Sequence, residues 1–197
     1  MIILASQSAA RRAMLTAAGV AHMAVPAHVD EVEVTAGLVA AGAPPDRIAD
    51  ALAELKAIKI SRSHGSALVL GADSVLVAAD GALIDKAETR SAAMVQLQRL
   101  SGATHRLISA AVFVRDGVAV WRATGTARLT MRPLSDGFIT AYLDVEGDDL
   151  LGCVGCYRIE GRGAQLLTRV DGDQFTVRGL PLLEILDYLR VCGELPA

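Results

Sequence analysis

The first residues that could do chemistry follow a short apolar segment at the start of the chain. Residues 2–5 are typical of a buried strand, and Ser6-Gln7-Ser8 then caps a helix that runs to about Ala18. The N-terminus of a helix leaves backbone N–H groups free to bind an anion. Arg11 lies about one turn further on, facing inward, whereas Arg12 points to solvent. An inward Arg11 could bind phosphate through two donors, and a surface ion pair is the equally weighted alternative.

Carboxylates occur at two places where they could bind a metal ion or position water. Gly71-Ala72-Asp73-Ser74 follows a strand predicted over 67–70. Ligands of open α/β sheets collect at the carboxyl ends of strands, where Asp73 could hold Mg²⁺. A turn aspartate that accepts backbone hydrogen bonds is the common alternative. The second place is Asp30-Glu31, in a segment over 25–34 that we expect to be a loop or edge, where such pairs are usually only solvated.

Three lysines are candidate cations. Lys86 follows the hairpin that Asp80-Gly81 predicts and could reach the same edge of the sheet, although a solvated lysine is the more common outcome. In the helix predicted over 46–60, Lys59 falls near the middle of the apolar stripe and Lys56 at its edge. Periodicity therefore leaves open which of the two enters a site. The stripe that we predict for this helix contains Ile48, Leu52 and Leu55.

Two cysteines form the C-x-x-C pair Cys153-Val154-Gly155-Cys156. Only Cys192 and four scattered histidines remain, so no second half of a zinc site has suitable spacing. A redox pair would lie at a strand-to-helix turn with a lowered thiol pKa, whereas this one precedes a strand predicted over 156–159. Two small buried residues are the favoured interpretation, and a thiol redox or zinc protein is the alternative.

The common motifs for nucleotide binding and acyl transfer are missing from the sequence. There is no G-x-x-x-x-G-K-[ST] loop, no G-x-G-x-x-G after a strand and no G-x-S-x-G elbow. Taken together, the residues described above would make a cleft that binds metal and phosphate. No one of these residues would establish it alone.

The elements that must position these residues alternate between helices and strands, which is typical of the α/β class. A turn at Asp116-Gly117 joins two of the strands in a hairpin. Further helices are predicted over 88–100, 134–145 and 181–191, and further strands over 107–114, 118–129, 156–159 and 166–170.

Composition bounds the class of protein. With 197 residues, of which 52% are hydrophobic and 21% charged, the chain can bury one sizeable core, and general disorder is excluded. No apolar run is long enough to span a bilayer, and no signal peptide is recognisable. The net charge of −3 gives no footprint for nucleic acid. Three cysteines, an odd number, favour a reducing compartment, so we expect a cytoplasmic protein with neither nucleic-acid nor membrane partners.

Taken in order along the chain, these motifs resemble the Maf-like nucleotide pyrophosphatases, and the resemblance covers nearly the whole chain. Each motif is short, but six or more in this order are specific. They are Leu4-Ala5-Ser6-Gln7-Ser8-Ala9-Ala10-Arg11-Arg12, Val29-Asp30-Glu31, Leu52-Ala53-Glu54-Leu55-Lys56-Ala57, Gly71-Ala72-Asp73-Ser74, Lys86, Leu100-Ser101-Gly102 with His105, Gly155-Cys156-Tyr157-Arg158-Ile159-Glu160-Gly161 and Gly179-Leu180-Pro181-Leu182.

The resemblance implies a fold and a reaction. The fold is α/β, with a mixed, strongly curved central sheet flanked by helices and two lobes with a cleft, in a single domain over 1–197. The reaction hydrolyses a nucleoside triphosphate to the monophosphate and pyrophosphate, with Mg²⁺ or Mn²⁺ as cofactor. The partner is thus a small-molecule nucleotide. Homodimers are common in such families, and composition does not fix the oligomeric state.

The resemblance also implies roles for individual residues. Asp73 would accept the proton of the attacking water, and Glu31 would bind the metal together with Asp73. Four residues would hold the triphosphate and neutralise charge on the leaving pyrophosphate. These are Ser8, Arg11, Lys56 and Lys86.

One segment of the resemblance distinguishes two branches of the family. The branch that acts on dTTP and UTP has Gln where this chain has Glu160, whereas Cys153 and Glu160 match the branch that hydrolyses 7-methyl-GTP. A Glu only accepts hydrogen bonds, which suits the N1–H and N2–H₂ donors of guanine, and N7 methylation makes the base cationic. Ala10 and Ser74 match further positions linked to substrate choice, although Ala10 cannot stack on a base as the Trp of some members can.

We therefore predict a 7-methyl-GTP pyrophosphatase. Two alternatives stay open. One is a dTTP/UTP pyrophosphatase of the same family, and the other is a nucleotide-binding regulator of septum formation with little turnover. The family usually has Pro at the positions of Ala9 and Ala87, which we interpret as differences in backbone tuning.

Overall fold

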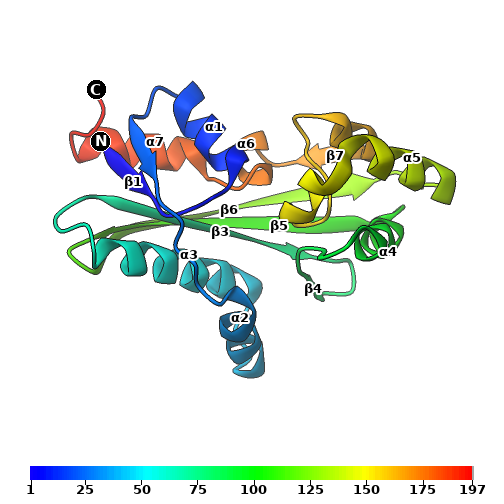
Figure 1. Ribbon diagram of the computed structural model, residues 1–197, viewed down its shortest axis with the longest axis horizontal. Helices are drawn as coiled ribbons and strands as arrows, with labels where there is room; N and C mark the ends of the chain where they lie inside the picture. The colour runs from blue at the N-terminus through cyan, green and yellow to red at the C-terminus, as the bar shows by residue number, and fades with distance from the viewer. Residues whose placement is uncertain (197) are drawn as a thin grey trace. The chain divides into compact units, whose positions relative to one another are not determined.

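The computed structural model describes residues 1–196 and contains a mixed β-sheet flanked by helices (Figure 1). Within these residues seven strands pair in the order β2-β1-β3-β5-β6-β7, and β4 pairs with β3. β1 runs parallel to β2 and β3, whereas β4 is antiparallel to β3 and β7 to β6. This confirms the predicted α/β class. The strands are β1 (Ile2–Leu4), β2 (His22–Ala24), β3 (Val69–Val77), β4 (Leu83–Ile84), β5 (Thr104–Arg115), β6 (Val118–Met131) and β7 (Leu167–Asp171).

The helices agree with most of the predicted ranges, to within a few residues at each end. Among residues 1–196, no helix is both long and apolar enough to cross a membrane. The helices are α1 (Ala9–Ala17), α2 (Glu31–Ala40), α3 (Pro45–Ser61), α4 (Arg90–Leu100), α5 (Asp136–Glu146), α6 (Gln174–Val177) and α7 (Leu182–Val191), with 3₁₀ helices η1 (Gly147–Gly152) and η2 (Arg162–Leu166).

The chain divides into two compact units. Unit 1 contains Met1–Ser74, Ser109–Gly125 and the segment from Gly179 onward, and unit 2 contains Val75–Ile108 and Thr126–Arg178. Strands β3, β5 and β6 each contribute residues to both units. One domain over residues 1–197 stays a prediction.

In unit 1, α3 covers one face of the sheet, and α1 and α7 cover the other (Figure 1). Gly71 on β3 allows α3 to pack very closely, because a Cβ atom there would lie 2.0 Å from the carbonyl oxygen of Ala53 and 2.9 Å from Cβ of Ala57. A larger residue at position 71 would displace the helix backbone. The close approach fixes which side of α3 is buried.

The buried side of α3 differs from the predicted stripe. Ile48 and Leu52 are buried as expected, but Leu55 is 36% exposed, and the buried face continues through Ala53, Lys56 and Ala57. The prediction for Leu55 is wrong because the small residues facing Gly71, and not the leucines alone, decide the helix orientation.

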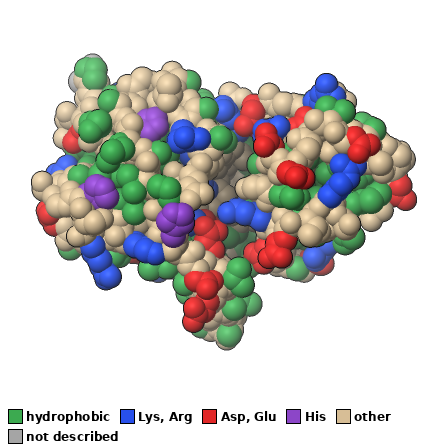
Figure 2. Space-filling model, viewed as in Figure 1, with side chains coloured by type: hydrophobic (Ala, Val, Ile, Leu, Met, Phe, Trp, Pro, Cys, Tyr) green, Lys and Arg blue, Asp and Glu red, His purple; other side chains and the backbone are tan. Residues whose placement is uncertain are grey.

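Helix α2 replaces the loop or edge that we predicted around Asp30-Glu31. Asp30 is its N-cap, and its side chain accepts a hydrogen bond from the Glu33 N–H at 2.9 Å. None of its residues is buried, and Figure 2 shows acidic and hydrophobic side chains together on its surface. The prediction failed because this exposed helix has no apolar stripe in its sequence. The only local signal for the helix was Asp30, a residue type that favours the N-cap position.

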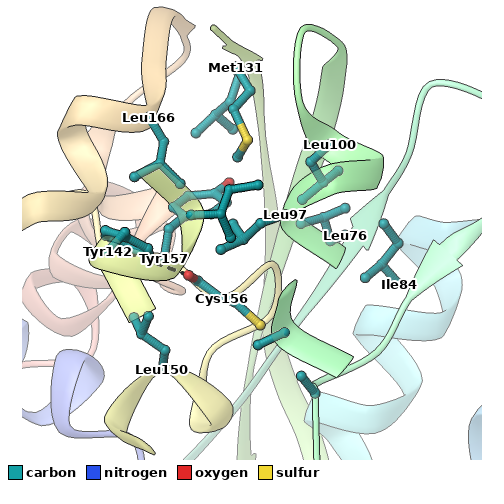
Figure 3. Close-up of a cluster of buried hydrophobic side chains, with 14 of the residues drawn as sticks. Leu76, Ile84, Leu97, Leu100, Met131, Tyr142, Leu150, Cys156, Tyr157 and Leu166 are labelled. Atoms are coloured by element: carbon teal, nitrogen blue, oxygen red, sulfur yellow. Dashed lines mark hydrogen bonds between the residues drawn. The ribbon is translucent and has the colours of Figure 1, made fainter. Parts of the chain in front are cut away.

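Unit 2 has its own apolar core, in which α4 packs against α5 and η1 (Figure 3). Leu97, Leu100, Met131 and Leu166 belong to this core. The strand predicted over 156–159 is wrong. The chain turns there instead, with positive φ at Gly155 and Cys156. The apolar residues of that segment misled the prediction because their side chains fill the core without forming a strand.

Candidate functional site

A buried lysine joins two carboxylates in unit 1. The Nζ of Lys56 lies 2.5 Å from Oδ1 of Asp73 and 2.6 Å from Oε1 of Glu31. The side chains of Lys56 and Asp73 are each only 8% exposed, whereas that of Glu31 is 37% exposed. A buried charge is tolerated when it is paired, and here one cation is shared by two anions. Three residues predicted for the site are therefore in direct contact.

Each member of this trio comes from a different element. Asp73 lies on β3 two residues after Gly71, and Lys56 lies on the face of α3 that packs on Gly71. Glu31 is the first residue of α2, held by the Asp30 cap. Because α3 approaches β3 so closely, the lysine side chain reaches the strand carboxylate. Lys59, which the periodicity also allowed, is exposed, and its Nζ donates to the carbonyl of His28.

Arg11 is buried as predicted, and Arg12 on the same helix is exposed. The Arg11 guanidinium donates from Nε to the carbonyl of Gly179 at 2.9 Å and from Nη1 to the carbonyl of Ala72 at 2.9 Å. It also donates to Oγ of Ser6 at 3.3 Å and Oγ of Ser74 at 3.0 Å. Four of its five N–H donors are thus engaged within the protein. Its role in binding phosphate stays a prediction, and these bonds give it a scaffolding role.

The charge of Arg11 nevertheless interacts with the carboxylates of Asp73 and Glu31. Burial lowers the pKa of Arg11 from its usual value, and the negative charges of Asp73 and Glu31 act in the opposite direction. The electrostatic attraction between Arg11 and these two carboxylates is mutual. Two cations therefore surround Asp73, one in direct contact and one acting through space.

The hydroxyl groups nearby form hydrogen bonds with both backbone and side chains. Within the predicted cap segment Ser6-Gln7-Ser8, Ser8 is the N-cap of α1, and its Oγ accepts from the Arg11 N–H at 3.4 Å. Ser74, predicted to influence substrate choice, bonds to Ser109 at 2.8 Å as well as to Arg11. Ala10 is half-buried on α1. Ser6 and Gly179 were not predicted to contact Arg11, although both lie in the quoted motifs.

The carboxylates of Glu31 and Asp73 are suitable ligands for a hard divalent cation. Both place an oxygen within 2.6 Å of the same Lys56 ammonium group, so both face one small volume of positive charge. Among residues 1–196, no three His, Cys, Asp or Glu side chains are grouped as a metal site. Two carboxylates with water and substrate phosphate oxygens are a common Mg²⁺ environment, so the donor set fits.

The other predicted site residues lie in unit 2. Lys86 forms an isolated β-bridge with Val154, next to Cys153. The charges of Arg158, Glu160 and Lys86 all act on the Cys153 thiol. This places Lys86 and Glu160 in one neighbourhood of unit 2. Glu160 is itself paired with Arg178, whose Nε lies 3.6 Å from Oε1.

The C-x-x-C pair lacks the properties of a reactive thiol. Burial raises the pKa of Cys153, and burial raises that of Cys156 to about 11. Cys153, Cys156 and Cys192 are all free. A redox or catalytic cysteine needs a lowered pKa, because the thiolate is the nucleophile. The geometry therefore favours a packing role, with Cys156 in the core of unit 2.

Comparison with known proteins identifies the family. The profile described as Maf-like protein matches residues 1–192. The chain belongs to the Maf-like protein family. The match includes both groups of residues described above, the Lys56 trio and the Glu160 neighbourhood.

Individual relatives of the Maf-like family are similar over almost their whole length. A protein of Sphingopyxis alaskensis named nucleoside triphosphate pyrophosphatase is 51% identical over 195 residues, which cover 99% of this chain and 98% of that protein. One of the same name from Caulobacter vibrioides is 47% identical, covering 98% and 96%. A protein of Brucella abortus named 7-methyl-GTP pyrophosphatase is 44% identical over 189 residues, covering 96% and 94%.

Proposed function

We propose that this protein is a hydrolase that converts a nucleoside triphosphate and water to the nucleoside monophosphate and pyrophosphate. The observation that carries the proposal is the contact of Lys56 with both Asp73 and Glu31. Membership of the Maf-like family and the names of the relatives support it. The arrangement offers a carboxylate base and a cation in one place, as hydrolysis of a phosphoanhydride requires.

Asp73 is the proposed proton acceptor. The water oxygen forms a bond to the α-phosphorus, the bond from that phosphorus to the α–β bridging oxygen breaks, and pyrophosphate leaves. The proton of the water passes to a carboxylate oxygen of Asp73. Lys56 holds Oδ1 of Asp73 in place at 2.5 Å, and the second carboxylate oxygen is the proposed acceptor of the proton.

A divalent cation, Mg²⁺ or Mn²⁺, is proposed as the cofactor, with Glu31 and Asp73 as its protein ligands. When bound, it would supply positive charge to the phosphate oxygens. Lys56 and Lys86 are proposed to neutralise negative charge on the triphosphate. Arg11 orders the backbone at Ala72 and Gly179, and Ser8 orders the start of α1.

The proposed substrate is 7-methyl-GTP, with Glu160 as the residue that recognises the base. A carboxylate accepts hydrogen bonds from the two donors on the guanine edge, whereas uracil and thymine also present acceptors. The similarity to the Brucella protein named 7-methyl-GTP pyrophosphatase supports this choice. We place the reaction in the cytoplasm, with nucleotide as the partner and a homodimer as the proposed assembly. The three free cysteines agree with a reducing compartment.

Pyrophosphate release from a nucleotide panel tests the proposal. The panel contains 7-methyl-GTP, GTP, UTP, dTTP and CTP, each with Mg²⁺, with Mn²⁺ and with a chelator. We expect metal-dependent release with a preference for the guanine nucleotides. A preference for UTP and dTTP would support the proposed reaction but contradict the proposal that Glu160 recognises guanine. Nucleotide binding without turnover would favour the regulator of septum formation.

A further inference from the structure

An arginine that neither the motifs nor the proposed function uses lies against Glu160. Arg178 follows α6 directly, and its backbone N–H donates to the carbonyl of Gln174 at 3.1 Å. Its Nε lies 3.6 Å from Oε1 of Glu160, with the two side chains 20% and 35% exposed. This Nε is buried and has no hydrogen-bond partner. The pair therefore attracts through charge, without a hydrogen bond at this distance.

The backbone around Glu160 is tightly held. The Gly161 N–H donates to the carbonyl of Arg158 at 3.1 Å, which closes a turn around Glu160. A Cβ atom on Gly163 would lie only 2.4 Å from that same carbonyl, so the following residues are packed onto the turn. Glu160 therefore lies on a turn whose backbone is closed by a hydrogen bond and packed against the next residues.

The other arginine of this turn is already paired. Arg158 donates to Oε2 of Glu146 at 2.9 Å and to Oδ2 of Asp149 at 3.5 Å. The Glu146 side chain is 7% exposed and the Arg158 side chain 36% exposed, so a half-buried arginine pairs with a buried carboxylate. Two anions balance Arg158, whereas Arg178 is the arginine that the structure pairs with Glu160.

We infer that Arg178 determines how strongly the base site prefers a cationic base over a neutral one. The inference rests on the proposed role of Glu160 in reading guanine. Accepting hydrogen bonds from N1–H and N2–H₂ needs only the lone pairs of the carboxylate. Attraction to the positive charge of 7-methylguanine depends on the negative charge of the site, and the positive charge of Arg178 partly cancels the negative charge of Glu160. Arg178 is thus a positioning and specificity residue. It makes kcat/KM for GTP and kcat/KM for 7-methyl-GTP more nearly equal.

The ratio of two substrates that differ by one methyl group tests this inference. The quantity is kcat/KM for 7-methyl-GTP divided by kcat/KM for GTP. In the Arg178→Met variant we expect the ratio to rise about fivefold, since a partly exposed cation is removed from beside the carboxylate. Arg178→Lys keeps the charge without the planar fork, so the ratio should stay within twofold of the original.

Arg162→Met is the matched control. Arg162 is exposed on η2, two residues after Glu160, and its removal changes the net charge of the protein by the same amount. We expect an unchanged ratio. Circular dichroism and thermal unfolding of each variant check that it folds. An unchanged ratio in folded Arg178→Met, or an equal rise in Arg162→Met, would overturn the inference.

Binding of the two monophosphate products separates this inference from the proposed reaction. Calorimetric titration with 7-methyl-GMP and GMP measures base preference without any turnover. A rise in their affinity ratio in Arg178→Met supports the role of Arg178 even if no pyrophosphate is released from any triphosphate. If the affinity ratio of the two products is the same in Arg178→Met as in the original protein, the inference fails, whatever the panel of triphosphates shows.

Discussion

Lys56 on α3 binds Asp73 on β3 through a contact of 2.5 Å between Nζ and Oδ1. The same Nζ lies 2.6 Å from Glu31 on α2. The two contacts tie the start of an exposed helix to a buried strand. They also give Asp73 a fixed orientation and a counter-charge, which are two requirements for a carboxylate that must take a proton from a positioned water.

The first prediction concerns the base. Asp73→Asn removes the proton acceptor but keeps the size of the side chain, and Glu31 remains as a partner for Lys56. We therefore expect kcat to fall by about 10²-fold or more while the protein stays folded. Pyrophosphate release under saturating nucleotide measures the effect, with unfolding by denaturant as the check on structure.

The matched control for the base is Asp80→Asn. Asp80 is an exposed hairpin carboxylate that pairs with Arg99, so its loss should leave kcat unchanged. Turnover of Asp73→Asn equal to that of Asp80→Asn would remove Asp73 from the chemistry.

Arg11 should be essential to the fold in a way that Arg12 is not. Arg11→Lys retains the charge but cannot reproduce donation to four acceptors, among them the carbonyls of Ala72 and Gly179. We expect the free energy of unfolding to fall by about 2–4 kcal/mol, because buried acceptors lose their donors. Arg12→Lys on the exposed face should change it by less than about 0.5 kcal/mol. Equal stabilities in urea unfolding would refute the scaffold role.

The close packing of α3 on β3 should be sensitive to a single methyl group. In Gly71→Ala the new Cβ would lie 2.0 Å from the Ala53 carbonyl, so the helix that carries Lys56 must move. We expect a loss of stability of at least about 2 kcal/mol together with reduced turnover. Gly37→Ala on exposed α2 meets nothing within 4 Å and should be neutral or slightly stabilising. Thermal unfolding of both variants tests the contrast.

His105 should make stability depend on pH. Its Nε2 lies 2.6 Å from the Tyr157 hydroxyl, and burial lowers its pKa to about 4. Between pH 6.5 and 4 the unfolded chain therefore takes up a proton that the folded protein does not. The contribution of neutral His105 to the free energy of unfolding is therefore fully present above pH 6.5 and decreases as the pH falls toward 4. At pH 5 the free energy of unfolding is lower by about 2 kcal/mol because of this group.

A His105→Gln variant isolates that contribution. Gln does not titrate, so the difference in unfolding free energy between the two proteins should shrink by about 2 kcal/mol from pH 7.5 to pH 5. Urea unfolding at both values measures it. A constant difference would mean that His105 titrates with an ordinary pKa in the folded state.

Local patterns in the sequence determined the fold class, the orientation of several side chains and the family of this protein. The α/β class followed from alternating elements, and the inward position of Arg11 beside outward Arg12 followed from the helical period alone. The order of short motifs indicated the family that the profile over residues 1–192 then showed. These features depend only on neighbours within a few residues or on the order of motifs, and both can be seen in the sequence itself.

Only the tertiary structure decided which partners these residues meet. Periodicity could not choose between Lys56 and Lys59, because the buried side of α3 is set by Gly71 on another element. Arg11 reaches the carbonyl of Gly179, 168 residues away, and Arg178 pairs with Glu160, which directly follows the segment 156–159 that was predicted as a strand. A repeat of 3.6 or 2 residues reports which way a side chain points within its own element. Which helix packs at which distance depends on contacts between distant segments, and no local pattern contains them.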